Sequence, residues 1–159
     1  LEVVVAVTSH DAKAVSSSEG MERSRLTSPF YNQWLRSAGD DYAEAALAIA
    51  TRDFEKLATV TELSCLKMHS LMLTSSPTLS YWTPASVACM DRIRELRNHG
   101  EAVFFTVDAG PQIKAVCLPE SRVTVAKALS EVPGVLEILS CSLGEGARII
   151  DDEEPLTGR

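Results

Sequence analysis

The segment AVFFTVDAGPQIKAVCLP, residues 102–119, decides the fold because it holds two strand-like runs on either side of a short turn. AVFFTVD and IKAVCLP are rich in β-branched and aromatic residues, which favour strands. Between them, AGPQ contains Gly110 and Pro111, two residues typical of turns. Two strands joined by so short a connection pair antiparallel. The first run ends on a single carboxylate, Asp108, placed at the strand end against the turn.

The sequence on both sides of this segment predicts further strands and several helices. Continuous apolar and β-branched runs predict strands at 1–8 and 136–143, and ARII predicts one at 147–150 after a turn at Gly144 and Gly146. Helical periodicity predicts helices over about 18–27, 29–51, 54–71, 84–99 and 122–132. Their starts are marked by capping residues, which are Ser16, Ser28 before Pro29, Asp53, and Thr83 before Pro84.

This order of elements predicts an α+β fold rather than a doubly wound one. Strands that are neighbours in sequence pair antiparallel through short turns, and the helices gather on one face of a sheet of about four strands. Residues 1–150 are expected to form one domain, and DDEEPLTGR at 151–159 an acidic, solvated tail.

Composition narrows the classes of partner. The 159 residues carry a formal net charge of −7, which disfavours nucleic acid and anionic membranes but allows a small anionic ligand in a local basic pocket. The four cysteines form no CxxC pair and the three histidines are scattered, so we expect no metal site and reduced thiols in the cytoplasm. The strand-like first residues lack an initiator Met and a signal-peptide pattern, which suggests a fragment of a longer chain.

Two segments contain groups suited to catalysis or ligand binding, and each also has a purely structural interpretation. Asp108 can face a ligand from a rigid strand end, although from the residues alone it more often accepts N–H groups of its own turn. SSSEGM at 16–21 places three hydroxyls at a helix start, which suits a phosphate but also fits an ordinary N-cap. His69, in the middle of a helix, is expected to be a core or surface residue, and Tyr81 and Trp82 to pack.

Several segments together resemble the C-terminal part of the diphosphomevalonate decarboxylases, which belong to the GHMP kinase superfamily. These segments occur in the family's order and cover residues 1 to about 118; they are SSSEGM (16–21), TSPFYNQWL (27–35), RDFEKLATVTELSCLKMHS (52–70), YWTPAS (81–86) and FFTVDAGPQIK (104–114). The resemblance implies a GHMP-kinase C-terminal fold with a ferredoxin-like core. It also implies ATP-dependent conversion of mevalonate 5-diphosphate to isopentenyl diphosphate, with loss of phosphate and carbon dioxide.

The resemblance also assigns roles to three residues. Asp108 resembles the family's catalytic aspartate, Ser17 a serine at the substrate and phosphoryl-transfer site, and Met21 a methionine that contacts substrate. We expect Asp108 to be only partly exposed, since a fully solvated charge is strongly screened. ATP and Mg²⁺ would bind mainly through an N-terminal domain that these residues do not include, and the full-length protein would be a cytoplasmic homodimer.

The sequence departs from the family pattern in two ways. Gln112 stands where the family has Asn, and its extra methylene is expected to change ligand geometry near the turn. Without the N-terminal domain, the chain would hold half an active site and be inactive alone. Two alternatives stay open, namely a related kinase acting on mevalonate or its phosphates and a non-catalytic small-molecule-binding or dimerisation module.

Overall fold

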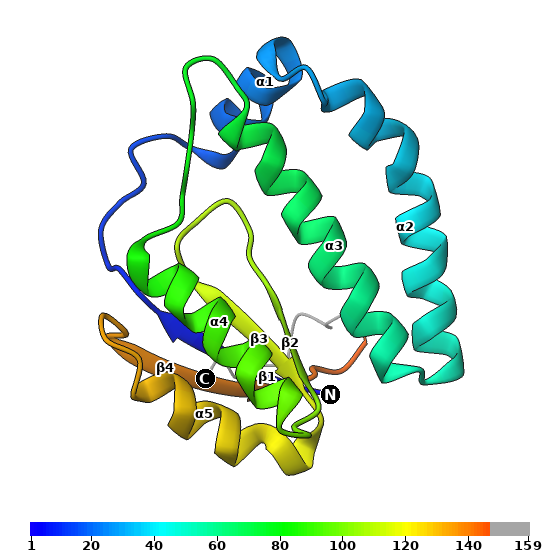
Figure 1. The fold of residues 1–159 in the computed structure, drawn as a ribbon, viewed down its shortest axis with the longest axis vertical. Coiled ribbons are helices and arrows are strands. Elements are labelled where there is room, and N and C mark those ends of the chain that lie inside the picture. Colours follow the sequence, from blue (N-terminus) through cyan, green and yellow to red (C-terminus); the bar gives the residue numbers. More distant parts are fainter. Residues whose placement is uncertain (147–159) are drawn as a thin grey trace, which may run out of the picture.

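The computed structural model describes residues 1–146, which form a four-stranded antiparallel sheet with five α-helices (Figure 1). The strands are β1 (Glu2–Val7), β2 (Val103–Thr106), β3 (Ile113–Cys117) and β4 (Glu137–Ser142). The helices are α1 (Ser17–Thr27), α2 (Tyr31–Thr51), α3 (Phe54–Leu73), α4 (Pro84–Asn98) and α5 (Arg122–Ser130), with a 3₁₀ turn at Pro119–Ser121. The α+β class is therefore confirmed.

The sheet order is β2-β3-β1-β4, and every neighbouring pair is antiparallel. In the β2–β3 hairpin, Phe105 lies opposite Ala115, as the short connection predicts. Apart from the extra helices between β1 and β2, the element order is β-α-β-β-α-β, which is the split βαβ arrangement of ferredoxin-like folds. This topology confirms the predicted core.

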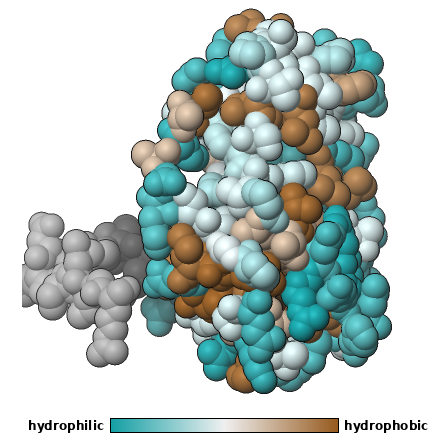
Figure 2. Space-filling view, turned by 60° about the vertical axis from the view of Figure 1, so that its left-hand side comes forward, coloured by the Kyte–Doolittle hydropathy of each residue, from teal (hydrophilic) through white to brown (hydrophobic). Residues whose placement is uncertain are grey.

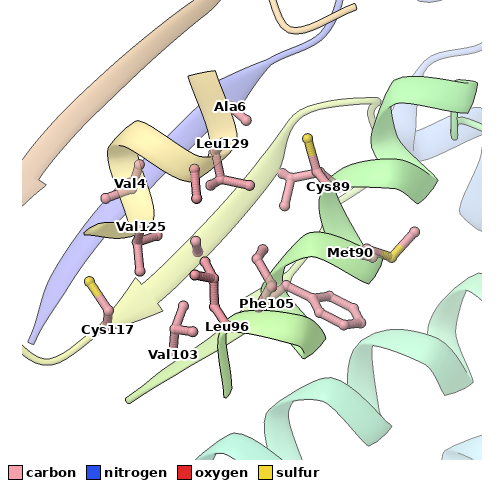
Figure 3. Close-up of a cluster of buried hydrophobic side chains, with 14 of the residues drawn as sticks. Val4, Ala6, Cys89, Met90, Leu96, Val103, Phe105, Cys117, Val125 and Leu129 are labelled. Atoms are coloured by element: carbon pink, nitrogen blue, oxygen red, sulfur yellow. The ribbon is translucent and has the colours of Figure 1, made fainter. Parts of the chain in front are cut away.

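The main core lies between one face of the sheet and the helices α4 and α5 (Figure 3). Alternate strand residues point to this face because side chains in a strand have a period of two. Phe105 and Ile113 are fully buried there, and Leu129 of α5 is fully buried against them. The other fully buried members are Val4, Ala6, Cys89, Ile93, Val103, Ala115, Cys117 and Val125.

Helix α3 covers the edge of the sheet at β2, and α2 packs along the outer side of α3 (Figure 1). The Phe105 N–H donates to Glu62 of α3 at 3.2 Å, and Glu62 also accepts two hydrogen bonds from Arg97 of α4. Covering an edge strand in this way satisfies backbone groups that a neighbouring strand would otherwise pair. α1, α2 and α3 thus extend beyond the sheet edge, while α4 and α5 cover its face as predicted.

Capping explains most helix starts, with one correction. The side chains of Ser16, Asp53 and Thr83 accept the expected backbone N–H groups. Ser28 does not cap α2, which begins at Tyr31 without a side-chain cap. Its hydroxyl instead pairs at 2.8 Å with Thr74, the C-cap residue of α3, and accepts from the N–H of Phe30, so it forms a turn between α1 and α2.

The predicted strand at 147–150 and the tail at 151–159 lie outside the described residues. On the face turned forward in Figure 2, apolar residues form several patches between hydrophilic ones. Among residues 1–146, none of the helices combines the length and the apolarity needed to cross a bilayer.

Candidate active site

Asp108 lies two residues after the end of β2 and stands on the outer side of the turn. Its side chain is 76% exposed, and its Oδ2 accepts a hydrogen bond from Lys114 Nζ at 2.6 Å. The expectation of partial exposure is therefore wrong, because the described residues leave the outer side of this turn open. Within residues 1–146, the carboxylate accepts no turn N–H group; Gly110 N donates to the Asp108 backbone oxygen instead. The turn-capping interpretation does not describe this side chain.

Lys13 joins the turn to the start of α1. Its Nζ donates to the Ser17 hydroxyl and to the Ala109 carbonyl, both at 2.8 Å, and lies 5.8 Å from the centre of the Tyr81 ring. Ser17 is the first residue of α1, as predicted. One ammonium group therefore connects Ser17 to the residue next to Asp108.

Met21 lies one turn further along α1 and is partly buried. It packs against the small apolar cluster of Met72, Leu79 and Tyr81, and Ala109 of the turn packs against the same cluster. The Tyr81 hydroxyl donates to the carbonyls of residues 15 and 16, which fixes the start of α1. The structure thus brings the segment 16–21 next to the turn at 108–112, although it does not test the role of Met21.

Asp108 borders two openings of different character. One is about 420 Å³ and is lined by the small residues of the turn together with charged and polar side chains such as Lys13, Gln112 and Lys114. The other is about 370 Å³, lies between α2, α3 and the end of β2, and is lined mainly by apolar and aromatic residues such as Trp34 and Met68. A carboxylate at their junction can contact a ligand that has both a charged and an apolar part.

The side chain of Gln112 holds the turn in place through two hydrogen bonds. Its side-chain oxygen accepts the Thr8 N–H and its side-chain nitrogen donates to the Ser9 carbonyl, both at 2.6 Å. The carbonyl of Pro111 accepts from the hydroxyls of Thr8 and Ser86, at 2.9 and 2.6 Å. The Gln112 side chain thus reaches the two residues that follow β1, and its effect on ligand geometry stays a prediction.

Behind the turn, α3 contacts Val107 through two buried side chains. His69 is 2% exposed and its Nε2 lies 3.0 Å from the Val107 oxygen, which confirms that it is a core residue. Burial lowers the pKa of His69, while the hydrogen bond to Val107 and the nearby Asp108 charge act in the opposite direction. Trp82 packs on the imidazole with ring centroids 4.7 Å apart, which confirms its packing role.

Sequence reasoning missed Lys13 and Lys114 as site residues. Lysines are usually solvated and their partners are not encoded locally. The antiparallel register could have identified Lys114, which lies opposite Thr106, two residues before Asp108. Lys13 contacts a carbonyl 96 positions away, which only the fold reveals.

The described residues provide no metal centre of their own. Within 1–146, no three or more His, Cys, Asp or Glu side chains converge closely enough to hold an ion. The four cysteines are free, and burial raises the pKa of the Cys89 thiol to about 11.

Comparison with known proteins agrees with this geometry. A family model described as "Mevalonate 5-diphosphate decarboxylase C-terminal domain" matches residues 3–148. Mevalonate pyrophosphate decarboxylase from Streptococcus pyogenes matches the structure with a TM-score of 0.85 and 32% identity, over 93% of this chain and 46% of that one. The solved protein MDDEF matches with a TM-score of 0.80 and 31% identity, over 87% of this chain and 42% of that one.

A curated relative, the diphosphomevalonate decarboxylase of Eremothecium gossypii, is 30% identical over 84% of this chain and 34% of its own length. The chain therefore spans between a third and a half of the proteins it matches. The family match includes α1, the β2–β3 hairpin and the turn that carries Asp108. The chain belongs to the mevalonate 5-diphosphate decarboxylase C-terminal domain family.

Proposed function

We propose that this chain forms the carboxy-terminal part of the active site of an ATP-dependent mevalonate 5-diphosphate decarboxylase. Asp108 is the catalytic carboxylate, and Ser17 and Met21 contact the substrate. The enzyme phosphorylates the tertiary hydroxyl of mevalonate 5-diphosphate, then releases phosphate and carbon dioxide to form isopentenyl diphosphate for isoprenoid synthesis. The observation that carries the proposal is the exposed Asp108 carboxylate at the end of β2, flanked by Lys114 and close to the Lys13–Ser17 pair.

The chemistry requires a carboxylate in this place. A tertiary alcohol is a hindered and weakly acidic nucleophile, so a base about 3 Å away must orient it and accept its proton. Lys114 contacts Oδ2 of Asp108, and among the described residues no hydrogen bond is made to Oδ1. That oxygen is available to the hydroxyl. After the carboxylate has passed that proton to solvent, its restored negative charge stabilises the positive charge that develops at the tertiary carbon as phosphate leaves.

The neighbouring groups suit an anionic substrate. Lys13 supplies a positive charge beside the Ser17 hydroxyl, and both lie at the N-terminus of α1, where backbone N–H groups point outward. This local arrangement opposes the formal net charge of −7 of the whole chain. It fits the oxygens of a phosphate or diphosphate group.

ATP and magnesium enter the proposal through the relatives. MDDEF was solved in complex with MVAPP, AMPPCP and magnesium. By the family resemblance, ATP and magnesium bind mainly through the N-terminal part of these enzymes. A homodimeric full-length protein in the cytoplasm completes the proposal and follows from the family resemblance.

The test is product analysis of the full-length protein that contains this chain, with ATP and mevalonate 5-diphosphate labelled at the carboxylate carbon. Labelled carbon dioxide together with isopentenyl diphosphate supports the proposal. Phosphate transfer without carbon dioxide would indicate a related kinase, and neither product would indicate a binding or dimerisation module. The 159-residue chain alone should release no carbon dioxide above a mock preparation, because it spans less than half the length of the decarboxylases it matches.

A further inference from the structure

The backbone of Val107, the residue directly before Asp108, is bound entirely by side chains of α3. Its N–H donates to Cys65 Sγ at 3.3 Å, and its carbonyl accepts from the Cys65 thiol at 3.4 Å and contacts His69 Nε2 at 3.0 Å. Cys65 and His69 are four residues apart and therefore share one face of the helix. Val107, Cys65 and His69 are 1%, 6% and 2% exposed, so water does not compete for these contacts.

These contacts begin where the sheet stops. The β2–β3 pairing ends at Thr106 opposite Lys114, so Val107 has no strand partner in the sheet. Buried backbone groups without partners are costly, and the α3 side chains satisfy both groups of this residue. Glu62, one turn earlier on α3, does the same for the Phe105 N–H.

The protonation state of His69 suits a hydrogen-bond donor that is held in one orientation. To donate to a carbonyl, the neutral ring must carry its proton on Nε2. Burial lowers the pKa of His69 and so favours the neutral ring, and Trp82 packs against the imidazole. The ring is thus held between Val107 and Trp82.

We propose that Cys65 and His69 are positioning residues for Asp108, which they orient through the backbone of Val107; this rests on the proposed function. The Val107 carbonyl and the Asp108 nitrogen belong to one planar peptide unit, so bonds to the carbonyl fix the plane from which Asp108 projects. On the outer side, Lys114 is the one ion-pair partner of the carboxylate among residues 1–146, and pairs this exposed orient a side chain weakly. A displacement of about 1 Å at a catalytic group reduces turnover by as much as ~10²-fold.

The test compares substitutions that remove the hydrogen bonds with substitutions that keep them, in the full-length enzyme. His69→Phe and Cys65→Val remove the polar atoms while preserving approximate volume, whereas His69→Gln and Cys65→Ser retain a donor. Cys89→Val is the matched control, since Cys89 is fully buried in α4 and, within residues 1–146, its thiol makes no hydrogen bond to the turn. We expect His69→Phe and Cys65→Val to lower kcat by roughly 10- to 100-fold with little change in KM for mevalonate 5-diphosphate. His69→Gln, Cys65→Ser and Cys89→Val should each stay within about threefold of the unmodified enzyme.

Two outcomes overturn the inference in an active enzyme. One is equal kcat for His69→Phe and His69→Gln in folded protein, and the other is a loss confined to KM. If the unmodified enzyme releases no carbon dioxide, the proposed function fails, and amide hydrogen exchange of the peptide containing residues 104–108 decides this inference separately. Exchange at Val107 should be at least about tenfold faster in Cys65→Val than in Cys65→Ser; equal exchange in the two variants would reject the α3 contact.

Discussion

The turn at residues 108–112 has two sides that differ in charge and in solvation. The front side is charged or hydroxylic and open to solvent; it consists of Asp108, Lys114, Lys13 and Ser17. The back side is neutral and mostly buried; it consists of Cys65, His69, Thr8, Ser86 and Gln112. Front-side groups contact each other in pairs, and Lys13 also binds one backbone carbonyl, that of Ala109. Back-side groups bind mainly the backbone of residues 107–112 and of the residues that follow β1.

The back side therefore holds the turn in position, and the front side supplies the groups for chemistry. A buried neutral hydrogen bond contributes only about 1 kcal/mol, but leaving its partner unsatisfied costs about 1–3 kcal/mol, so the back side fixes the turn. An exposed ion pair adds about 0–1 kcal/mol to stability, so the front side is free to exchange its partners for those of a substrate. Substitutions on the front side should therefore change activity while the fold persists. Substitutions on the back side should change the position of the turn and the stability of the fold.

The largest expected effect lies on the front side, at Asp108. In the full-length enzyme, Asp108→Asn should lower kcat by roughly 10²–10⁴-fold, because the amide cannot accept the hydroxyl proton. It also supplies no negative charge against a developing cation. KM should change little, since the loss is confined to the transition state. Steady-state kinetics with a circular-dichroism spectrum is the measurement.

A matched control is Asp91→Asn, which removes a carboxylate from another exposed ion pair, with Arg94 on α4. This variant should be as active as the unmodified enzyme. Near-normal kcat in folded Asp108→Asn would return Asp108 to an ordinary role at a surface turn.

Lys13 gives the second effect on the front side. Lys13→Met removes the charge that joins Ser17 to the Ala109 carbonyl, and hydrogen bonds to charged groups contribute about 1.5–3 kcal/mol. We expect the affinity for mevalonate 5-diphosphate to fall roughly 10- to 100-fold, as measured by isothermal titration calorimetry on the full-length enzyme. Lys127→Met on the exposed side of α5 is the control and should bind normally; equal affinity of the two variants would remove Lys13 from the site.

The sequence predicted the elements better than it predicted the turn's two sides. Periodicity identified β1, the β2–β3 hairpin and all five helices, because each signal is local. It failed at Ser28, whose hydroxyl pairs with Thr74 on another helix. It also missed the burial pattern at the site, since the exposure of Asp108 and the partners of Lys13 and Gln112 depend on segments distant in sequence.

A smaller perturbation is a substitution at Gly20, which packs against Tyr81 near the start of α1. A Cβ on Gly20 would lie 2.5 Å from the Tyr81 hydroxyl and 2.9 Å from Leu79 Cδ2, so Gly20→Ala must displace the tyrosine that holds the start of α1. Overpacking of this kind costs about 1–3 kcal/mol, against a gain of at most ~1 kcal/mol in helix propensity. Urea unfolding of the 159-residue chain should show a net loss of stability.

Gly39 in α2 provides the opposite case. A Cβ there would meet nothing within 4 Å, so Gly39→Ala should stabilise the chain by up to ~1 kcal/mol through helix propensity alone. Gly20→Ala and Gly39→Ala with the same sign of effect would show that the contact with Tyr81 is not limiting.

The smallest effect concerns the back side and pH. Burial lowers the pKa of His69 in the folded chain, whereas the unfolded chain binds a proton near the model-peptide value of about 6.5. Below that pH the unfolded state gains a proton that the folded state does not, so the free energy of unfolding must fall as pH decreases from about 6.5 toward the lowered pKa. The slope from one such group is at most about 1.4 kcal/mol per pH unit. His69→Gln removes the group and should flatten the dependence of the free energy of unfolding on pH between 7.5 and 5.5, as measured with urea; His10→Gln, at an exposed position, is the substitution control. A slope unaltered by His69→Gln would mean that the imidazole is protonated equally in both states, and the back side would then contain a charge rather than only neutral groups.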